Sequence, residues 1–281
     1  MATARPASLG DLRRRHVVEG RPIPEDVERA LAEDTRPGAR VLLEAIARKR
    51  RDNRAEGQRL RKMLRFEMAL WDAGVERIAG VDEAGMSPLA GPVAAAACIL
   101  PVGARLPGVD DSKKLSEKER DRLAEVIRER AIAWAVAYVE PEEIDRINIY
   151  WAGILAMRRA VAKLASPPQH LLVDARRIRE IPLPQERIVH GDARSLSIAA
   201  ASILAKTSRD RRMDAYDAEY PGYGFARHKG YPVRAHKEAL ARLGACPLHR
   251  RSFGPVRIAI GLPPLPPWPG PAERPTIDLG L

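Results

Sequence analysis

Two adjacent carboxylates, Asp82 and Glu83, directly follow a short apolar segment and are followed by Gly, Pro and small residues in the stretch AGVDEAGMSPLAGP, residues 79–92. An acidic pair on a solvated surface needs no such neighbours. Acidic side chains at the end of a buried strand, beside a glycine-rich main chain, suit a divalent cation and a phosphate bound close to the backbone. The stretch therefore predicts a strand that ends at a binding site.

Two further acids lie where other apolar segments end. Asp174 follows residues 171–173, and Asp192 follows residues 188–189 after one histidine and one glycine. Burying an unpaired carboxylate is costly, and several carboxylates at one sheet edge would also repel one another. Bound Mg²⁺ or Mn²⁺ would remove this conflict, and a pair of such ions can activate a water and stabilise a leaving 3′-oxygen. These residues alone leave a second interpretation open, in which the acids are scattered strand ends or helix caps.

The charge of the chain favours a polyanionic partner. Its 48 Lys and Arg residues exceed its 37 Asp and Glu residues, which gives a formal net charge of +11. An excess of this size attracts polyanions and speeds their capture, and nucleic acid is the obvious candidate. A basic surface that serves only solubility is the alternative that composition leaves open.

Basic side chains cluster in four segments. Residues 111–116 (DSKKLS) place hydroxyls and ammonium groups just before a helix start, a favourable position for a phosphate. Residues 206–212 carry one lysine and three arginines at the end of a long expected helix. Residues 228–232 (HKGYP) and 249–253 (HRRSF) interleave basic with aromatic side chains. This pattern suits contacts of the basic side chains with a nucleic-acid backbone, combined with stacking of the aromatic rings on a sugar or base. Each cluster alone is typical of a solvated face, but together with the net charge they predict a nucleic-acid groove.

Apolar segments and amphipathic helices predict the fold class. A capping box at Ser116 and Glu119 starts one helix, and Pro141 suits the first turn of another. The expected strands are residues 77–81, 93–100, 132–139, 170–173 and 187–189, and the expected helices of the body include 116–130, 195–213 and 233–243. Strands and helices mixed in this order indicate an α/β protein with a mixed sheet.

The composition divides the chain into three parts. Residues 1–72 form a basic extension with expected helices over 24–32 and 41–70, separated by Pro37-Gly38. This extension either packs on the body or grips phosphates, or it is a solvated charged arm. The body covers residues 73–258, and the proline-rich residues 259–281 are expected to be extended or disordered.

Several other classes of protein lack support. No apolar run approaches the roughly 20 residues of a membrane span, and residues 1–15 lack the apolar segment of a secretory signal, so we expect a cytoplasmic protein. Cys98 and Cys246 cannot form a disulfide framework or a zinc site alone. The sequence contains no G-x-x-x-x-G-K-[ST], G-x-G-x-x-G or H-E-x-x-H motif.

Residues 75–258 resemble bacterial ribonuclease HII, and the extension resembles that of the longer form of this family. The matching segments are AGVDEAGMSPLAGPV (79–93), DSKKLS (111–116), EIDRINI (143–149), LLVD (171–174), GDARSLSIAAASILAKTSRD (191–210), YPGYGFARHKGY (220–231) and HRRSF (249–253). The resemblance implies a ribonuclease H-like fold, with a mixed β-sheet flanked by helices and a C-terminal helical segment that closes the substrate groove. It also implies metal-dependent hydrolysis of the RNA strand of RNA/DNA hybrids and nicking 5′ to ribonucleotides embedded in DNA, which leaves 3′-hydroxyl and 5′-phosphate ends.

The resemblance also assigns roles to particular residues. Asp82, Glu83, Asp174 and Asp192 match the four catalytic carboxylates, which would hold Mn²⁺ or Mg²⁺, expected as two ions that share Asp82. Tyr231 matches the tyrosine that stacks against the sugar beside the ribonucleotide. Further nucleic-acid contacts are expected from Gly85, Met86, Ser87, Ser112, Lys113, Ser195 and Lys206. The expected partners are RNA/DNA hybrid and ribonucleotide-containing duplex DNA, with no membrane and no obligate protein partner, and a monomer is expected.

The first motif departs from the family pattern at two positions. Members usually continue the acidic pair with Ala-Gly-Arg-Gly, whereas this chain has Gly85-Met86-Ser87. Met86 removes a cation, and Ser87 adds a Cβ where glycine can adopt a positive φ. We therefore expect weaker discrimination of a single embedded ribonucleotide, with metal binding retained. The alternative is a hybrid-binding protein with weak or altered cleavage, either non-catalytic or similar to ribonuclease HIII.

Overall fold

The computed structural model describes residues 8–266, and the chain divides into two compact units, residues 1–61 and 62–281. The first unit contains α1 (Leu9–Arg13), a π-helical turn (Arg14–Val18), α2 (Glu25–Glu33) and most of α3 (Pro37–Met63). Their apolar side chains form a small core of Leu12, Ile23, Leu31, Ala39, Leu42 and Ile46. The break between the two helices lies before Pro37 and not at Pro37-Gly38 as predicted, since α2 ends at Glu33 and α3 begins at Pro37. Proline is tolerated at this first helical position because its missing amide would be unpaired there in any case.

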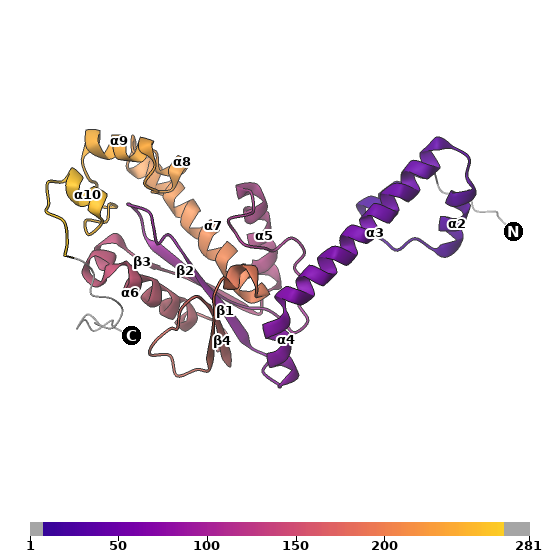
Figure 1. Ribbon diagram of the computed structural model, residues 1–281, viewed down its shortest axis with the longest axis horizontal. Helices are drawn as coiled ribbons and strands as arrows, with labels where there is room; N and C mark the ends of the chain where they lie inside the picture. Colours follow the sequence, from indigo (N-terminus) through magenta and orange to yellow (C-terminus); the bar gives the residue numbers. More distant parts are fainter. Residues whose placement is uncertain (1–7, 267–281) are drawn as a thin grey trace. The chain divides into compact units, whose positions relative to one another are not determined.

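A mixed five-stranded sheet forms the centre of the second unit (Figure 1). The strands are β1 (Ile78–Ala84), β2 (Val93–Ile99), β3 (Ala133–Val139), β4 (His170–Asp174) and β5 (Gln185–Ile188). They are arranged in the order β3-β2-β1-β4-β5. The pairs β1–β2 and β2–β3 are antiparallel, whereas β1–β4 and β4–β5 are parallel. The predicted α/β class with a mixed sheet is confirmed.

Helices cover the sheet on both faces (Figure 1). α6 (Pro141–Ala162) packs against β2 and β3, and α7 (Leu196–Glu219) packs against β1 and β2, with α5 (Glu117–Arg130) beside α7. Side chains alternate along β1, so Ala79 and Val81 join the core under α6 while Gly80 faces α7. The predicted cap of α5 is confirmed, since the Ser116 hydroxyl accepts a hydrogen bond from the Glu119 amide at 3.3 Å.

The start of α7 lies unusually close to β1 at Gly80. A Cβ at this glycine would lie 2.0 Å from the carbonyl carbon of Ser197 and 2.4 Å from the amide nitrogen of Ile198. Contacts this short involve rigid backbone on both sides, so any side chain at residue 80 would push the helix off the strand. The glycine therefore sets the distance between α7 and the end of β1.

The C-terminal helical segment consists of α8 (Phe225–His228), α9 (Arg234–Leu243) and α10 (Gly254–Ala259). Its core includes His228, His236 and His249, and the rings of His228 and His236 stack with centroids 4.5 Å apart. The histidines of the expected groove segments 228–232 and 249–253 are therefore core residues and do not grip a ligand. Among residues 8–266, no helix is long and apolar enough to cross a membrane. Most of the predicted proline-rich tail, from residue 267 onward, lies outside the described residues.

A buried carboxylate joins α4 (Arg65–Asp72) to the start of α7. The expected helix over 41–70 is broken at Leu64, whose φ of −87° and ψ of 4° interrupt the helical backbone and leave α4 as a separate helix. Glu67 is 1% exposed, and its Oε1 accepts hydrogen bonds from the Ser195 hydroxyl (2.6 Å), the Ser197 amide (2.9 Å) and the Ser197 hydroxyl (2.7 Å). Glu67 thus satisfies three donors at the start of α7.

Replacing Glu67 with Ala is expected to lower the free energy of unfolding by about 3 kcal/mol, because three buried donors lose their acceptor. Thermal unfolding followed by circular dichroism measures the effect. Met68→Ala is the control, since Met68 is an exposed neighbour in the same helix, and it should cost less than about 0.5 kcal/mol. Similar losses in the two variants would contradict the anchoring role of Glu67.

Candidate active site

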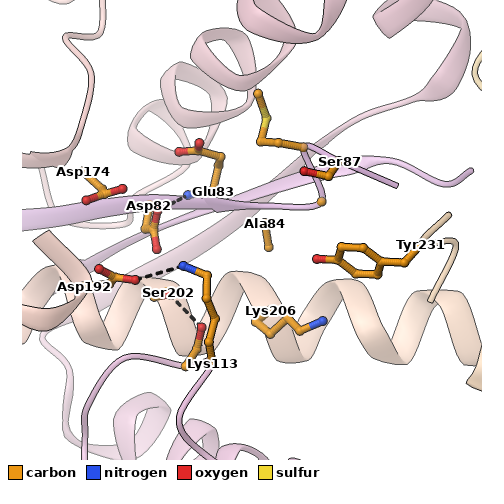
Figure 2. A pocket seen from close by; sticks show the side chains of 13 residues that line it. Asp82, Glu83, Ala84, Ser87, Lys113, Asp174, Asp192, Ser202, Lys206 and Tyr231 are labelled. Carbon is orange, nitrogen blue, oxygen red and sulfur yellow. Dashed lines mark hydrogen bonds and ion pairs between the residues drawn. The ribbon is translucent and has the colours of Figure 1, made fainter. Parts of the chain in front are cut away.

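A cavity of about 240 Å³ lies at the ends of β1 and β4 (Figure 2). Its lining residues are Asp82, Glu83, Ala84, Gly85, Met86, Ser87, Ser112, Lys113, Asp174, Asp192, Ser202, Lys206 and Tyr231. All four predicted carboxylates therefore meet at one cavity, together with every predicted nucleic-acid contact except Ser195.

Strand pairing brings the acids together. β1 and β4 are parallel and Val81 is paired with Val173, so Asp82 and Asp174 follow at the same end of neighbouring strands. Figure 2 shows the side chains of Asp82 and Glu83 leaving β1 on opposite sides, as alternation along a strand requires. Asp192 belongs to a short 3₁₀ helix (Gly191–Ala193) just before α7. The amide of Gly191 donates to Asp174 Oδ1 at 2.6 Å and so links the segments that carry these two acids.

Burial and mutual repulsion disfavour the ionised form of the carboxyls. Asp82 is 6% exposed, and its burial, followed by the charges of Glu83 and Asp174, holds its pKa well above the ordinary value. Burial also raises the pKa of Glu83, although Arg176 opposes this effect. Burial raises the pKa of Asp174 against the hydrogen bond from Gly191. A cation bound among these groups would relieve both burial and repulsion.

The donor set fits a hard divalent ion. Oε2 of Glu83 is buried and has no hydrogen-bond partner within residues 8–266. Carboxylate oxygens of this kind suit Mg²⁺ and Mn²⁺. Two cationic side chains lie beside the acids, with Lys113 Nζ 3.3 Å from Asp192 Oδ2 and Arg176 3.7 Å from Glu83 Oε1. In the described part of the chain, no three His, Cys, Asp or Glu side chains are arranged to hold an ion as they lie.

The turn after the acidic pair keeps one essential glycine. Gly85 has a φ of +89°, and a Cβ there would lie 2.1 Å from Nε of Arg209, so no other residue fits. The Met86 side chain packs on the core beside α6. A Cβ built on Gly153 of that helix would lie 3.2 Å from the Sδ of Met86. Ser87 is exposed and does not have a positive φ. The departures at Met86 and Ser87 therefore fit the turn without strain.

The other wall of the cavity combines Tyr231 with α7. Figure 2 shows the Tyr231 hydroxyl directed toward the carboxylates. Lys206 Nζ lies 5.5 Å from the centre of the Tyr231 ring and donates to Asp210 Oδ1 at 2.8 Å. On the wall opposite the β1 turn, the hydroxyls of Ser112 and Ser202 are 3.0 Å apart. Hydroxyls, an ammonium group and an aromatic ring thus surround the carboxylates.

The predicted phosphate contact of Ser195 is wrong. Ser195 is fully buried and caps α7, with its hydroxyl accepting from the Ile198 amide and donating to Glu67. A hydroxyl committed to these partners cannot reach a phosphate, so its role is to start the helix that carries Lys206.

Sequence reasoning missed two residues of the site, Ser202 and Arg176. Ser202 precedes Lys206 by four residues, and this spacing places both side chains on one face of α7. The spacing could have identified Ser202 from the sequence. Arg176 reaches Glu83 from the turn after β4, and no local pattern indicates that contact.

Comparisons with known proteins identify the family. The model of the ribonuclease HII family matches residues 79–256. This chain belongs to the ribonuclease HII family. The model of the ribonuclease HII N-terminal domain matches residues 22–71.

Relatives in the ribonuclease HII family are similar over most of the chain. Ribonuclease HII of Anaeromyxobacter sp. (strain Fw109-5) is 60% identical over 258 residues, which cover 92% of this chain and 82% of that protein. Ribonuclease HII of Myxococcus xanthus (strain DK1622) is 58% identical over 257 residues, covering 91% and 88%. The crystal structure of ribonuclease H2 from Pyrococcus horikoshii OT3 aligns with a TM-score of 0.57 at 26% identity, over 65% of this chain and 96% of that one. The predicted ribonuclease H-like fold and the assignment as a ribonuclease H type 2 endoribonuclease are confirmed.

Asp82→Asn is expected to stabilise the protein in EDTA, because an amide removes the cost of burying a carboxyl beside Glu83 and Asp174. The gain should be about 1 kcal/mol, or about 2–4 °C in Tm. Because the pKa of Asp82 is raised in the folded state, the unaltered protein loses stability as pH rises from the ordinary carboxyl range through the raised pKa. The Tm difference between variant and parent should therefore widen with pH. A difference that is constant between about pH 4 and about pH 8 would contradict this origin.

Proposed function

We propose that this endoribonuclease hydrolyses the RNA strand of RNA/DNA hybrids and nicks 5′ to ribonucleotides embedded in duplex DNA, leaving 3′-hydroxyl and 5′-phosphate ends. The observation that carries the proposal is the meeting of four carboxylates, Asp82, Glu83, Asp174 and Asp192, in one cavity with a glycine turn and a tyrosine. Membership of the ribonuclease HII family supports the same substrate class.

The carboxylates would hold the divalent metal, for which we propose Mn²⁺ or Mg²⁺, as two ions with Asp82 shared. Such ions supply a nucleophile at neutral pH and stabilise charge on the leaving oxygen. Neighbouring residues of the chain orient two of the carboxylates. Gly191 orients Asp174 through its amide, and Lys113 orients Asp192 through its ammonium group. Both contacts fix carboxylates that otherwise repel one another.

The substrate would lie between the glycine turn and Tyr231. The turn at Gly85-Met86-Ser87 offers main-chain groups to the ribose and the phosphate at the junction, and the Tyr231 ring offers a stacking surface for the sugar. Ser112, Lys113 and Lys206 line the same cavity and would contact phosphates. Recognition of ribose beside metal-dependent chemistry is what cleavage at a ribonucleotide requires.

Asp82→Asn is expected to lower the rate of hybrid cleavage at least about 10³-fold, because the shared carboxylate would be lost. Binding of the hybrid should be retained, since the variant removes negative charge from a site that faces phosphates. Cleavage of a labelled hybrid in Mn²⁺ or Mg²⁺ and fluorescence anisotropy in EDTA measure the two properties. Cleavage that persists in the variant or in excess EDTA would contradict the proposal. Binding without any metal-dependent turnover of the unaltered protein would favour the non-catalytic alternative.

The side chains at 86 and 87 are tested by comparing two substrates, a long hybrid and a duplex with one ribonucleotide. We expect a lower relative rate on the single ribonucleotide than in relatives with Arg and Gly at these positions, because Met86 supplies no cation at the junction. A strong preference for the single ribonucleotide would contradict this expectation. It would mean that main-chain groups suffice for recognition, and the double variant M86R/S87G should then change the ratio of the two rates less than about threefold.

Further predictions on the extension, the location and the assembly of the protein belong with this function. The basic extension, predicted over residues 1–72, is proposed as a helical unit distinct from the catalytic body; its compact part ends at residue 61, and α4 belongs to the second unit. The protein is proposed to act as a cytoplasmic monomer without an obligate protein partner. The first unit supports an electrostatic role for the extension, because α3 carries the exposed cations Arg48, Arg51 and Arg54 with few acids beside them.

A further inference from the structure

Two buried arginines, Arg209 and Arg250, have no part in the chemistry derived above. Both side chains are fully buried, and neither forms an ion pair with a carboxylate in the described part of the chain. Burial lowers the pKa of each guanidinium, and for Arg250 the nearby charge of Arg209 adds to this effect. Burying two like charges near each other is costly, so the contacts that they make need an explanation.

Arg250 holds the turn after the acidic pair. Its guanidinium donates to the carbonyl oxygens of Gly85 at 2.6 Å, Met86 at 3.1 Å and Gly91 at 2.9 Å. Five donors in a planar fork can serve three carbonyls at once, which an ammonium group on a flexible stem cannot do with the same geometry. The turn is therefore fixed through its main chain, independently of the side chains at 86 and 87.

Fixing these carbonyls also fixes the amides that follow them. The described residues contain no cis peptide bond, and in a trans peptide the N–H points away from the C=O. The amides of Met86 and Ser87 therefore point away from Arg250. Within residues 8–266 these two amides have no hydrogen-bond partner, and both residues line the cavity. They are free to donate to a ligand there.

Arg209 joins the same loop to the segment that carries Tyr231. It donates to the carbonyl oxygens of Ala90 at 3.1 Å and Pro92 at 2.9 Å on one side, and of Lys229 at 3.0 Å on the other. The Leu89 amide adds a bond to the Gly230 carbonyl at 2.8 Å. The separation between the turn and Tyr231 is thus set by a buried side chain of α7.

We propose that Arg250 and Arg209 are positioning residues that set the discrimination between ribose and deoxyribose. Arg250 aims the Met86 and Ser87 amides into the cavity, and Arg209 fixes their distance from Tyr231. The inference rests on the proposed function, in which the sugar lies between these two elements. It also accounts for the conformation of the turn at Met86 and Ser87, because Arg250 holds the main-chain carbonyls whichever side chains these residues carry.

The test measures binding in EDTA, so that it does not depend on cleavage. The probes are a DNA duplex with one ribonucleotide and the same duplex without it. The unaltered protein should prefer the first duplex, and Arg250→Lys, which keeps the charge but loses the fork, should reduce that preference about tenfold. Arg158→Lys is the matched control, a buried arginine of α6 that pairs with Glu180 away from the cavity, and it should keep the preference whatever its effect on Tm.

Three results would overturn the inference: no preference in the unaltered protein, an unchanged preference in folded Arg250→Lys, or an equal loss in Arg158→Lys. If Arg250→Lys does not fold, Ser87→Pro tests the same point, because it removes one amide and leaves both arginines in place. That variant should lose the preference as well, and full retention would overturn the inference. Failure of the proposed function is a separate result, namely no cleavage of either substrate type in Mn²⁺ or Mg²⁺.

Discussion

The close contact between α7 and β1 at Gly80 positions most of the residues that line the cavity. Because the glycine has no Cβ, the first turn of α7 lies against the strand that ends in Asp82. This placement brings the 3₁₀ helix of Asp192 next to β4, and it presents Ser202 and Lys206 to the cavity. Glu67 and the serine cap of α7 hold the same turn from the other side. A bulkier residue at 80 would therefore displace the carboxylates and the α7 side chains of the cavity together.

The carboxyls of the cavity oppose the stability of the fold that carries them. Asp82, Glu83 and Asp174 all have raised pKa values, because burial and mutual repulsion disfavour their charged forms. Proteins retain such groups where binding or catalysis requires them, and the cost is met by contacts elsewhere. Here those contacts include the tightly packed sheet and the hydrogen bonds from Gly191 and Lys113. The same repulsion makes the cavity a favourable place for a divalent cation.

Much of the fold follows from local sequence patterns. Short apolar segments identified all five strands to within a few residues, because strands buried on both faces appear in the sequence as near-continuous apolar runs. The capping box at Ser116 marked the start of α5. The break at Leu64 and the helix start at Pro37 were missed, because both depend on how neighbouring segments pack and on cap geometry. Element boundaries of this kind are not encoded by periodicity alone.

The sequence alone predicted a carboxylate site, because acids follow several apolar segments, and the parallel pairing of β1 with β4 then placed Asp82 and Asp174 at the same end of neighbouring strands. Folding decides which polar residues line the cavity. Ser112, Lys113 and Lys206 line the cavity, whereas Ser195, Arg209 and Arg250, drawn from equally promising segments, are buried. A basic or hydroxyl residue looks the same in sequence whether it faces solvent or main-chain carbonyls. The difference arises because buried carbonyls and helix ends need donors and caps, and that need is set by segments distant in the chain.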